Sequence, residues 1–160
     1  MFRHIIFEIK KRSRKFVRNK FLQYCEDGKL NKVKIFYWFA YHNKSWIIHA
    51  VMFASSKGRL DVIKWLHKKN CDIHCVDLVA VIWASIYRQM NVVQWLCEHS
   101  HDVTACHKHA IKWAAFYGDL NMVMWLHEHG ADITAKNNSA IQFAAKHGNI
   151  DVVKYIASKL

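Results

Sequence analysis

The chain has 160 residues, a length that suits one compact domain or one short repeat array. Hydrophobic residues make up 52% of it, proline is absent and only 5 residues are glycine, which excludes a linker-rich or disordered chain. The five cysteines form an odd number and no secretory signal precedes them, so we expect free thiols in a reducing compartment. No run approaches the roughly 18 apolar residues of a membrane span. We therefore expect an intracellular, cytoplasmic protein with no membrane partner.

Positive charge is concentrated at the start of the chain, within a formal net charge of +12. Residues 1–34 hold 11 Lys and Arg against 3 acids, whereas residues 35–160 hold 13 against 9. We interpret residues 1–15 as a basic N-terminal segment and residues 16–160 as a single domain. A basic segment can contact nucleic acid, acidic lipid or an acidic protein, and its simplest explanation is a solvated helix face. The helical spacing of Phe16, Val17, Phe21 and Leu22 predicts that this helix covers the end of the domain.

A nine-residue segment recurs at intervals of 30 without insertions, in register at Gly28, Gly58, Arg88, Gly118 and Gly148. Its five versions are "GKLNKVKIF", "GRLDVIKWL", "RQMNVVQWL", "GDLNMVMWL" and "GNIDVVKYI". The third position is always apolar, the fourth is Asn or Asp, and the eighth is usually aromatic. A second motif keeps the same period: alanine at 50, 80, 110 and 140 and again at 54, 84, 114 and 144, with an aromatic residue at 53, 83, 113 and 143. The chain therefore consists of about five repeats.

Each repeat has the pattern of two short helices. In "AIKWAAFYG" (110–118) the small residues at 110 and 114 allow another helix to approach closely, and Gly118 suits a left-handed C-cap. The second helix begins near residue 119, and Gly130 ends it. Residues 131–139 are too polar and short for a third helix and indicate a turn, with Ser139 as an N-cap. Because one helix pair cannot bury its apolar face alone, we predict an all-α fold, an α-solenoid of stacked helix pairs.

The histidines of "MVMWLHEHGADI" (122–133) resemble a metal or catalytic site only when that segment is taken alone. Beside "VIKWLHKKNCDI" and "VVQWLCEHSHDV" it is one more copy of a helix and its turn. We expect its apolar residues Met122, Val123, Trp125 and Leu126 to lie in the core. The best local zinc set, Cys97, His101, Cys106 and His107, lacks a tight C-x-x-C pair, and no nucleophile elbow or phosphate loop occurs. We expect no catalytic residue, metal or cofactor.

These segments resemble the ankyrin repeat. "GDLNMVMWLHEHGADITA" and "GNIDVVKYI" are similar to its second helix and following turn, and "SAIQFAAKHG" (139–148) lies where ankyrins place Thr-Pro-Leu-His-x-Ala-Ala-x-x-Gly. The match fails at the Pro and His, which are Ala140 and Gln142. The period is 30 rather than the usual 33, so the resemblance implies shortened hairpin fingers. The short, Trp-rich form resembles the ankyrin proteins that giant amoeba-infecting viruses encode.

The resemblance implies a non-enzymatic scaffold that binds an unidentified protein through its concave face, a host factor in the host cytoplasm if the chain is viral. Carried over by position, the partner-binding residues at the ends of the first helices are Lys57, Tyr87, Arg88, Phe116, Tyr117, Lys146 and His147. Turn positions His107, Lys108, Asn137 and Asn138 join them. The alternative function is nucleic-acid binding through the basic N-terminal segment, whose affinity would depend on salt. The oligomeric state stays open, because nothing caps the apolar residues of the last helix.

Overall fold

The computed structural model describes residues 2–40, 42–69, 73–100, 102–133 and 140–160, and side chains within these ranges from residue 13 on, except 73–76. The described residues form ten helices and no strand, which confirms the predicted all-α class. The helices are α1 (Phe2–Asp27), α2 (Leu30–Ala40), α3 (Lys44–Ser56), α4 (Leu60–Lys68), α5 (Ile73–Ile86), α6 (Met90–His99), α7 (Val103–Tyr117), α8 (Leu120–Glu128), α9 (Ala140–Lys146) and α10 (Ile150–Ala157).

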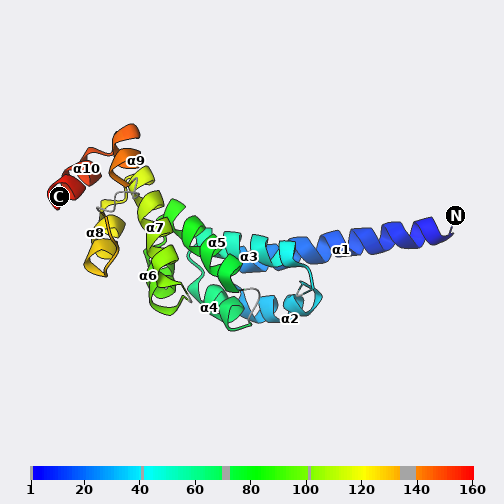
Figure 1. Cartoon of the computed structure of the whole chain (residues 1–160). Coiled ribbons are helices and arrows are strands. Elements are labelled where there is room, and N and C mark those ends of the chain that lie inside the picture. Colours follow the sequence, from blue (N-terminus) through cyan, green and yellow to red (C-terminus); the bar gives the residue numbers. More distant parts are fainter. Residues whose placement is uncertain (1, 41, 70–72, 101, 134–139) are drawn as a thin grey trace.

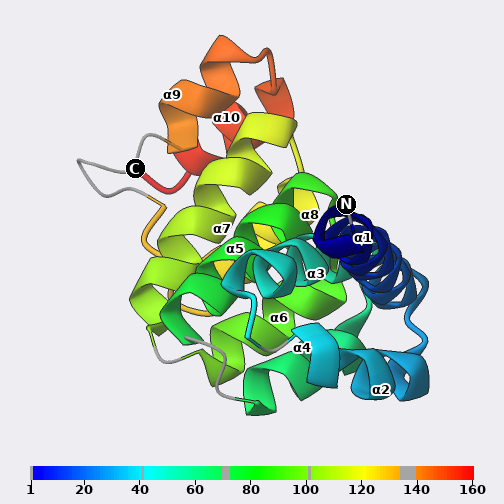
Figure 2. The same ribbon diagram turned by 90° about the vertical axis from the view of Figure 1, so that its right-hand side faces the viewer.

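The helices form a stack of five pairs. Each first helix (α1, α3, α5, α7, α9) packs against the second helix that follows it, and against the first helix of the next pair. Figure 1 shows the pairs following one another from α1 and α2 to α9 and α10, with the N-terminal part of α1 projecting beyond the stack. The view in Figure 2 looks along α1 onto this end of the stack, where α1, α2 and α3 lie.

Small side chains let consecutive first helices approach one another. The eight alanines of the two predicted columns are fully buried, at 50, 54, 80, 84, 110, 114, 140 and 144. Larger apolar side chains then fill the space between the first and second helices, among them Ile63, Leu66 and Leu96. Met122, Val123 and Leu126 are buried as expected. Trp125 packs against this core but is only half-buried, and its ring stacks on His129 with the ring centroids 4.0 Å apart.

The turn between the two helices of a pair is the same in every repeat. One residue of the turn adopts a left-handed conformation, with φ of 74° at Gly28, 71° at Gly118 and 71° at Gly148. The next amide donates back to a carbonyl five residues earlier, as from Asp119 N to Ala114 O at 2.8 Å. Arg88 holds the same place in its repeat with φ of 57°, the only non-glycine residue with positive φ in the described part of the chain. The predicted left-handed C-cap at Gly118 is thus confirmed.

Side chains from these turns hydrogen-bond across to neighbouring repeats. Asn149 Nδ2 donates to the carbonyls of Ala115 and Phe116, both at 2.8 Å, at the end of α7. Arg59 Nε donates to Glu26 O at 2.8 Å, and Arg88 Nη2 donates to Tyr117 O at 2.7 Å. The last carbonyls of a helix lack partners within that helix. Each first helix that receives such a bond is therefore capped by an adjacent repeat.

The connection between α6 and α7 is shorter than expected. The repeat pattern placed His107 and Lys108 in a turn, but both lie within α7, which begins at Val103. The side chain of Asp102 accepts a hydrogen bond from Ala105 N at 2.9 Å and starts the helix early, and no glycine or proline interrupts it. The predicted N-cap Ser139 lies outside the described residues. Among the described residues, no helix is both long enough and apolar enough to cross a membrane.

Gly118→Ala should destabilise the protein more than Gly148→Ala, although both glycines have a φ of 71°. A Cβ at Gly118 would lie 2.6 Å from Asn149 Oδ1, so Asn149 would have to release its two carbonyls, whereas a Cβ at Gly148 meets nothing within 4 Å. We expect Gly148→Ala to lower the free energy of unfolding by about 1 kcal/mol and Gly118→Ala by about 2 kcal/mol or more in urea titrations. Equal losses would contradict the capping role of Asn149.

Candidate functional site

An aromatic surface covers the exposed side of the first helices. Most of its members recur with the 30-residue period, on α3, α5, α7 and α9 or directly after α5 and α9, and all are exposed or half-buried. Tyr87 is 52% exposed, Tyr117 40% and Phe53 37%. We call this surface the aromatic face: Phe53, Trp83, Tyr87, Trp113, Phe116, Tyr117, Phe143 and His147.

Neighbouring rings on one helix hold each other in place. Trp83 and Tyr87 are stacked with their ring centroids 5.9 Å apart, and Trp113 and Tyr117 are stacked at 6.2 Å. Both pairs are four residues apart on a helix, the spacing at which side chains meet. The two exposed tyrosines therefore rest on half-buried tryptophans, which limits the conformational entropy that a bound partner would remove.

Phe116 joins the aromatic side chains of two repeats. Its ring centroid lies 3.8 Å from that of His147 and 6.2 Å from that of Phe143 in the next repeat, and 4.9 Å from that of Tyr117. Phe116 is half-buried, whereas Tyr117 and His147 are exposed. Phe116 thus packs partly on the next repeat and supports the more exposed rings beside it.

The aromatic face carries positive charge and little negative charge. Lys112 Nζ lies 5.0 Å from the centre of the Phe143 ring and 5.5 Å from that of Trp113. Helices α3, α5, α7 and α9 contain a single acidic residue, Asp77, which is only 4% exposed. An aromatic, cationic surface of this kind suits a partner with apolar and acidic groups.

The structure places the residues expected to bind a partner in three settings. Tyr87, Phe116, Tyr117 and His147 belong to the aromatic face. The polar and charged residues at the ends of first helices are exposed: Lys57, Arg88 and Lys146. The third group, the expected turn positions, is divided between α7 (His107 and Lys108) and the part of the chain that is not described (Asn137 and Asn138).

Two of these residues have further contacts that reduce their freedom to bind. Lys57 Nζ lies 3.6 Å from Glu26 Oε1, an ion pair at the surface. His107 is half-buried, and its pKa is lowered by burial and by the neighbouring His129, which follows α8. His107 therefore lies toward the second helix of its repeat, and Lys108 next to it is exposed.

Sequence reasoning missed half of the aromatic face. Phe53, Trp83, Trp113 and Phe143 occupy the recurrent aromatic column at the second motif, and this column served only to establish the period. The signal in the sequence is that this column stays aromatic in all four copies, but only the structure shows that the column lies partly at the surface.

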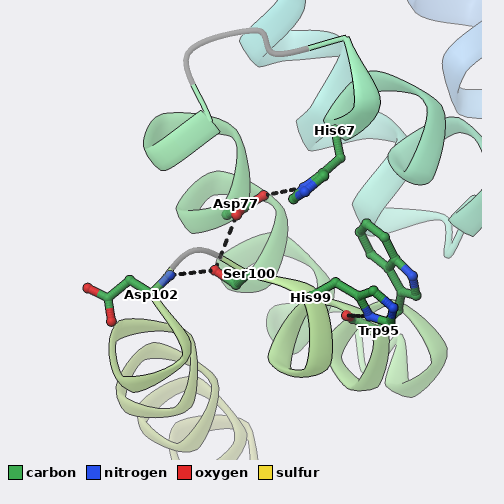
Figure 3. Close-up of polar contacts among 6 residues, drawn as sticks. All are labelled: His67, Asp77, Trp95, His99, Ser100 and Asp102. Atoms are coloured by element: carbon green, nitrogen blue, oxygen red, sulfur yellow. Dashed lines mark hydrogen bonds and ion pairs between the residues drawn. The ribbon is translucent and has the colours of Figure 1, made fainter.

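A polar cluster connects three successive repeats around Asp77 (Figure 3). His67 Nδ1 of α4 lies 3.0 Å from Asp77 Oδ1 on α5, and Ser100 Oγ donates to Asp77 Oδ2 at 3.2 Å. Ser100 Oγ also accepts from Asp102 N at 3.3 Å, where α7 begins. Asp77, Ser100, Asp102 and Cys106 line a pocket with a volume of about 200 Å³. Because a buried carboxylate needs partners, this cluster holds α4, α5 and the start of α7 in register.

The residue types Asp, His and Ser occur together in this cluster, but their arrangement is structural. In a hydrolytic triad the serine hydroxyl is hydrogen-bonded to the imidazole, which the carboxylate orients. Here the contact of the His67 ring and the hydrogen bond that the Ser100 hydroxyl donates both end at the Asp77 carboxylate, as Figure 3 shows. The imidazole is thus not placed to take the proton of that hydroxyl.

The thiols of the described residues are buried. Burial raises the pKa of Cys25 to about 12. Cys97 on α6 and Cys106 on α7 share a side-chain hydrogen bond, which raises the pKa of Cys97 and lowers that of Cys106. Cys97 and Cys106 belong to the local zinc set considered from the sequence, and they are neighbours in the structure. His101 of the same set lies outside the described residues. No group of three or more His, Cys, Asp or Glu side chains in the described part of the chain could hold a metal ion.

Removing the charge of Asp77 should loosen the contact between repeats. In Asp77→Asn the amide can no longer accept at both former oxygen positions, so one buried contact is lost. We expect the free energy of unfolding to fall by about 2 kcal/mol in urea titrations, and by about 1 kcal/mol in the control Ser100→Ala, which removes the hydroxyl that donates to Asp77 Oδ2. An unchanged midpoint for Asp77→Asn would contradict the structural role of the cluster.

The fold and the repeat positions agree with a comparison against protein-family models. The model for ankyrin repeats, which spans three copies, matches residues 51–137 and residues 100–159. Together the two matches cover about two thirds of the chain. No curated protein sequence matches it. With its stacked helix pairs, left-handed turns and matched repeats, the chain belongs to the ankyrin repeat family.

Proposed function

We propose that this protein is a non-enzymatic scaffold that binds another protein through the aromatic face. Ankyrin repeats generally serve as protein-interaction scaffolds. The observation that carries the proposal is the row of rings, exposed at Tyr87 and Tyr117 and supported from below by Trp83 and Trp113. Aromatic anchors on a rigid base, with cations beside them, are the residue types that contribute most to binding energy at interfaces.

The remaining expected residues extend this surface. Arg88 and Lys146 would contact the partner at the ends of first helices, and Lys57, His107 and Lys108 would do so at the edge. Asn137 and Asn138 stay part of the proposal by their place in the repeat. The similarity to the ankyrin proteins of giant amoeba viruses leads us to propose a host protein in the cytoplasm of an infected cell as the partner.

Removing the two exposed tyrosines should weaken capture of the partner. We would use the full chain as bait in a lysate of amoeba cells and compare wild type with Tyr87→Ala/Tyr117→Ala. The control is Ile150→Ala/Leu160→Ala, which removes two apolar side chains in the last repeat that are more exposed than the two tyrosines. We expect one specific protein with wild type and control, and about thirtyfold weaker binding for the tyrosine variant.

Two outcomes would count against the proposed surface. Capture of the same protein by the tyrosine variant with equal affinity would place the partner elsewhere on the molecule. Recovery of nucleic acid alone, unaffected by the tyrosine substitutions and lost with rising salt, would favour the alternative through the basic end of the chain. Equal urea midpoints for all variants would show that folding is not the cause of a loss.

A further inference from the structure

Helix α2 exposes a second apolar surface, separate from the aromatic face. Ile35 is 66% exposed, Trp38 70% and Phe39 55%, and the rings of Trp38 and Phe39 meet edge to face with their centroids 5.2 Å apart. The three residues have the spacing of one helix face, while Val33 and Ala40 on the opposite side are fully buried. We call this surface the α2 patch: Ile35, Trp38 and Phe39. With about 200 Å² per ring, Trp38 and Phe39 alone expose on the order of 250 Å².

The α2 patch departs from the pattern of the chain's own repeats. The positions of Trp38 and Phe39 hold exposed polar or charged residues in the next three repeats: Lys68 and Lys69, Glu98 and His99, and Glu128 and His129. The position of Ile35 holds a half-buried tryptophan in the same repeats. Stacking therefore does not require apolar side chains there, and their exposure in the first repeat needs another explanation.

Positive charge surrounds the α2 patch. Lys32 and Lys34 are exposed on either side of it, and α2 contains no acidic residue. Lys32 Nζ lies 5.2 Å from the centre of the Tyr24 ring on α1, so the patch borders the basic helix that packs against α2. Exposed Arg14 and Lys15 lie on α1. The patch thus directly follows, in sequence, the stretch of chain where Lys and Arg exceed acids by eight (11 against 3 in residues 1–34).

We propose that the α2 patch docks onto an anionic lipid surface, with Trp38, Ile35 and Phe39 entering the headgroup region and the lysines beside them contacting the lipid phosphates. Tryptophan prefers this region because its ring is apolar and its N–H is polar. Lys and Arg near the surface add attraction to anionic lipids. A second copy of the chain is a poorer occupant, since docking two α2 patches would bring the basic ends of both copies together. The proposal does not depend on the aromatic face.

Co-sedimentation of the full chain with lipid vesicles tests this docking. The vesicles are either phosphatidylcholine alone or phosphatidylcholine mixed with phosphatidylserine, and we expect binding only to the anionic mixture at low salt. The decisive variant is Trp38→Lys/Phe39→Lys, which introduces the residues that the second repeat carries at these positions and adds two positive charges. Insertion of the rings predicts at least about tenfold weaker binding in spite of the added charge. Equal or tighter binding would overturn the proposal, because charge alone would then explain the association.

Three further comparisons separate the possible causes of vesicle binding. Tyr87→Ala/Tyr117→Ala should bind the vesicles like wild type, so a failure of the protein scaffold and a failure of lipid docking are distinguishable. With lipids brominated near the headgroup, we expect quenching of tryptophan fluorescence in wild type and much less in Trp38→Phe, although Trp38→Phe still sediments. Light scattering provides the last comparison: a dimer that Trp38→Lys/Phe39→Lys dissociates would show that a second copy covers the patch, and would overturn lipid docking. Absence of binding to the anionic vesicles would also overturn it.

Discussion

Close contact between successive first helices is the constraint on which this structure depends. Buried alanines such as Ala80 and Ala110 let α5 and α7 approach until their backbones determine the spacing of the repeats. At that spacing, larger apolar side chains fill the space between the first and second helices. The aromatic column then lies on the exposed side of the first helices, in a regular row. The same alanine columns that hold the stack together therefore create the surface that we assign to partner binding.

Hydrogen bonds between turns complement this packing. A pair of helices leaves carbonyls without partners at the end of its first helix. The side chains of Arg59, Arg88 and Asn149 donate hydrogen bonds to such carbonyls in an adjacent repeat. Arg88 illustrates the balance, since its left-handed backbone is strained for a residue with a Cβ while its guanidinium holds Tyr117 O. In a solenoid with contacts only between neighbours, such bonds make the stability of each repeat depend on the repeats beside it.

Regular features of the fold could be predicted from the sequence, and departures from the repeat could not. The 30-residue period, the left-handed turns and the alanine columns follow from residue type alone. His107 and Lys108 were misplaced because the polar turn after Gly130 was transferred to a repeat that has Ser100 in that position, where Asp102 starts the helix. The aromatic residues at 53, 83, 113 and 143 were not assigned to a surface, because a repeat period does not reveal which side chains are exposed. The contacts of Asp77 join residues that are far apart in sequence, so only the packed structure brings them together.

Amide hydrogen exchange of Ala110→Leu tests the dependence on close helix contact most directly. Ala110 is fully buried on α7, whereas Ala145 on α9 is exposed, so Ala145→Leu is the matched control. We expect overpacking at position 110 to cost about 3 kcal/mol and to reduce protection mainly in α5, α7 and α9, with α1 and α3 keeping more of theirs. The control should change little. Wild-type protection throughout Ala110→Leu would contradict the claim that the alanine columns set the spacing of the stack.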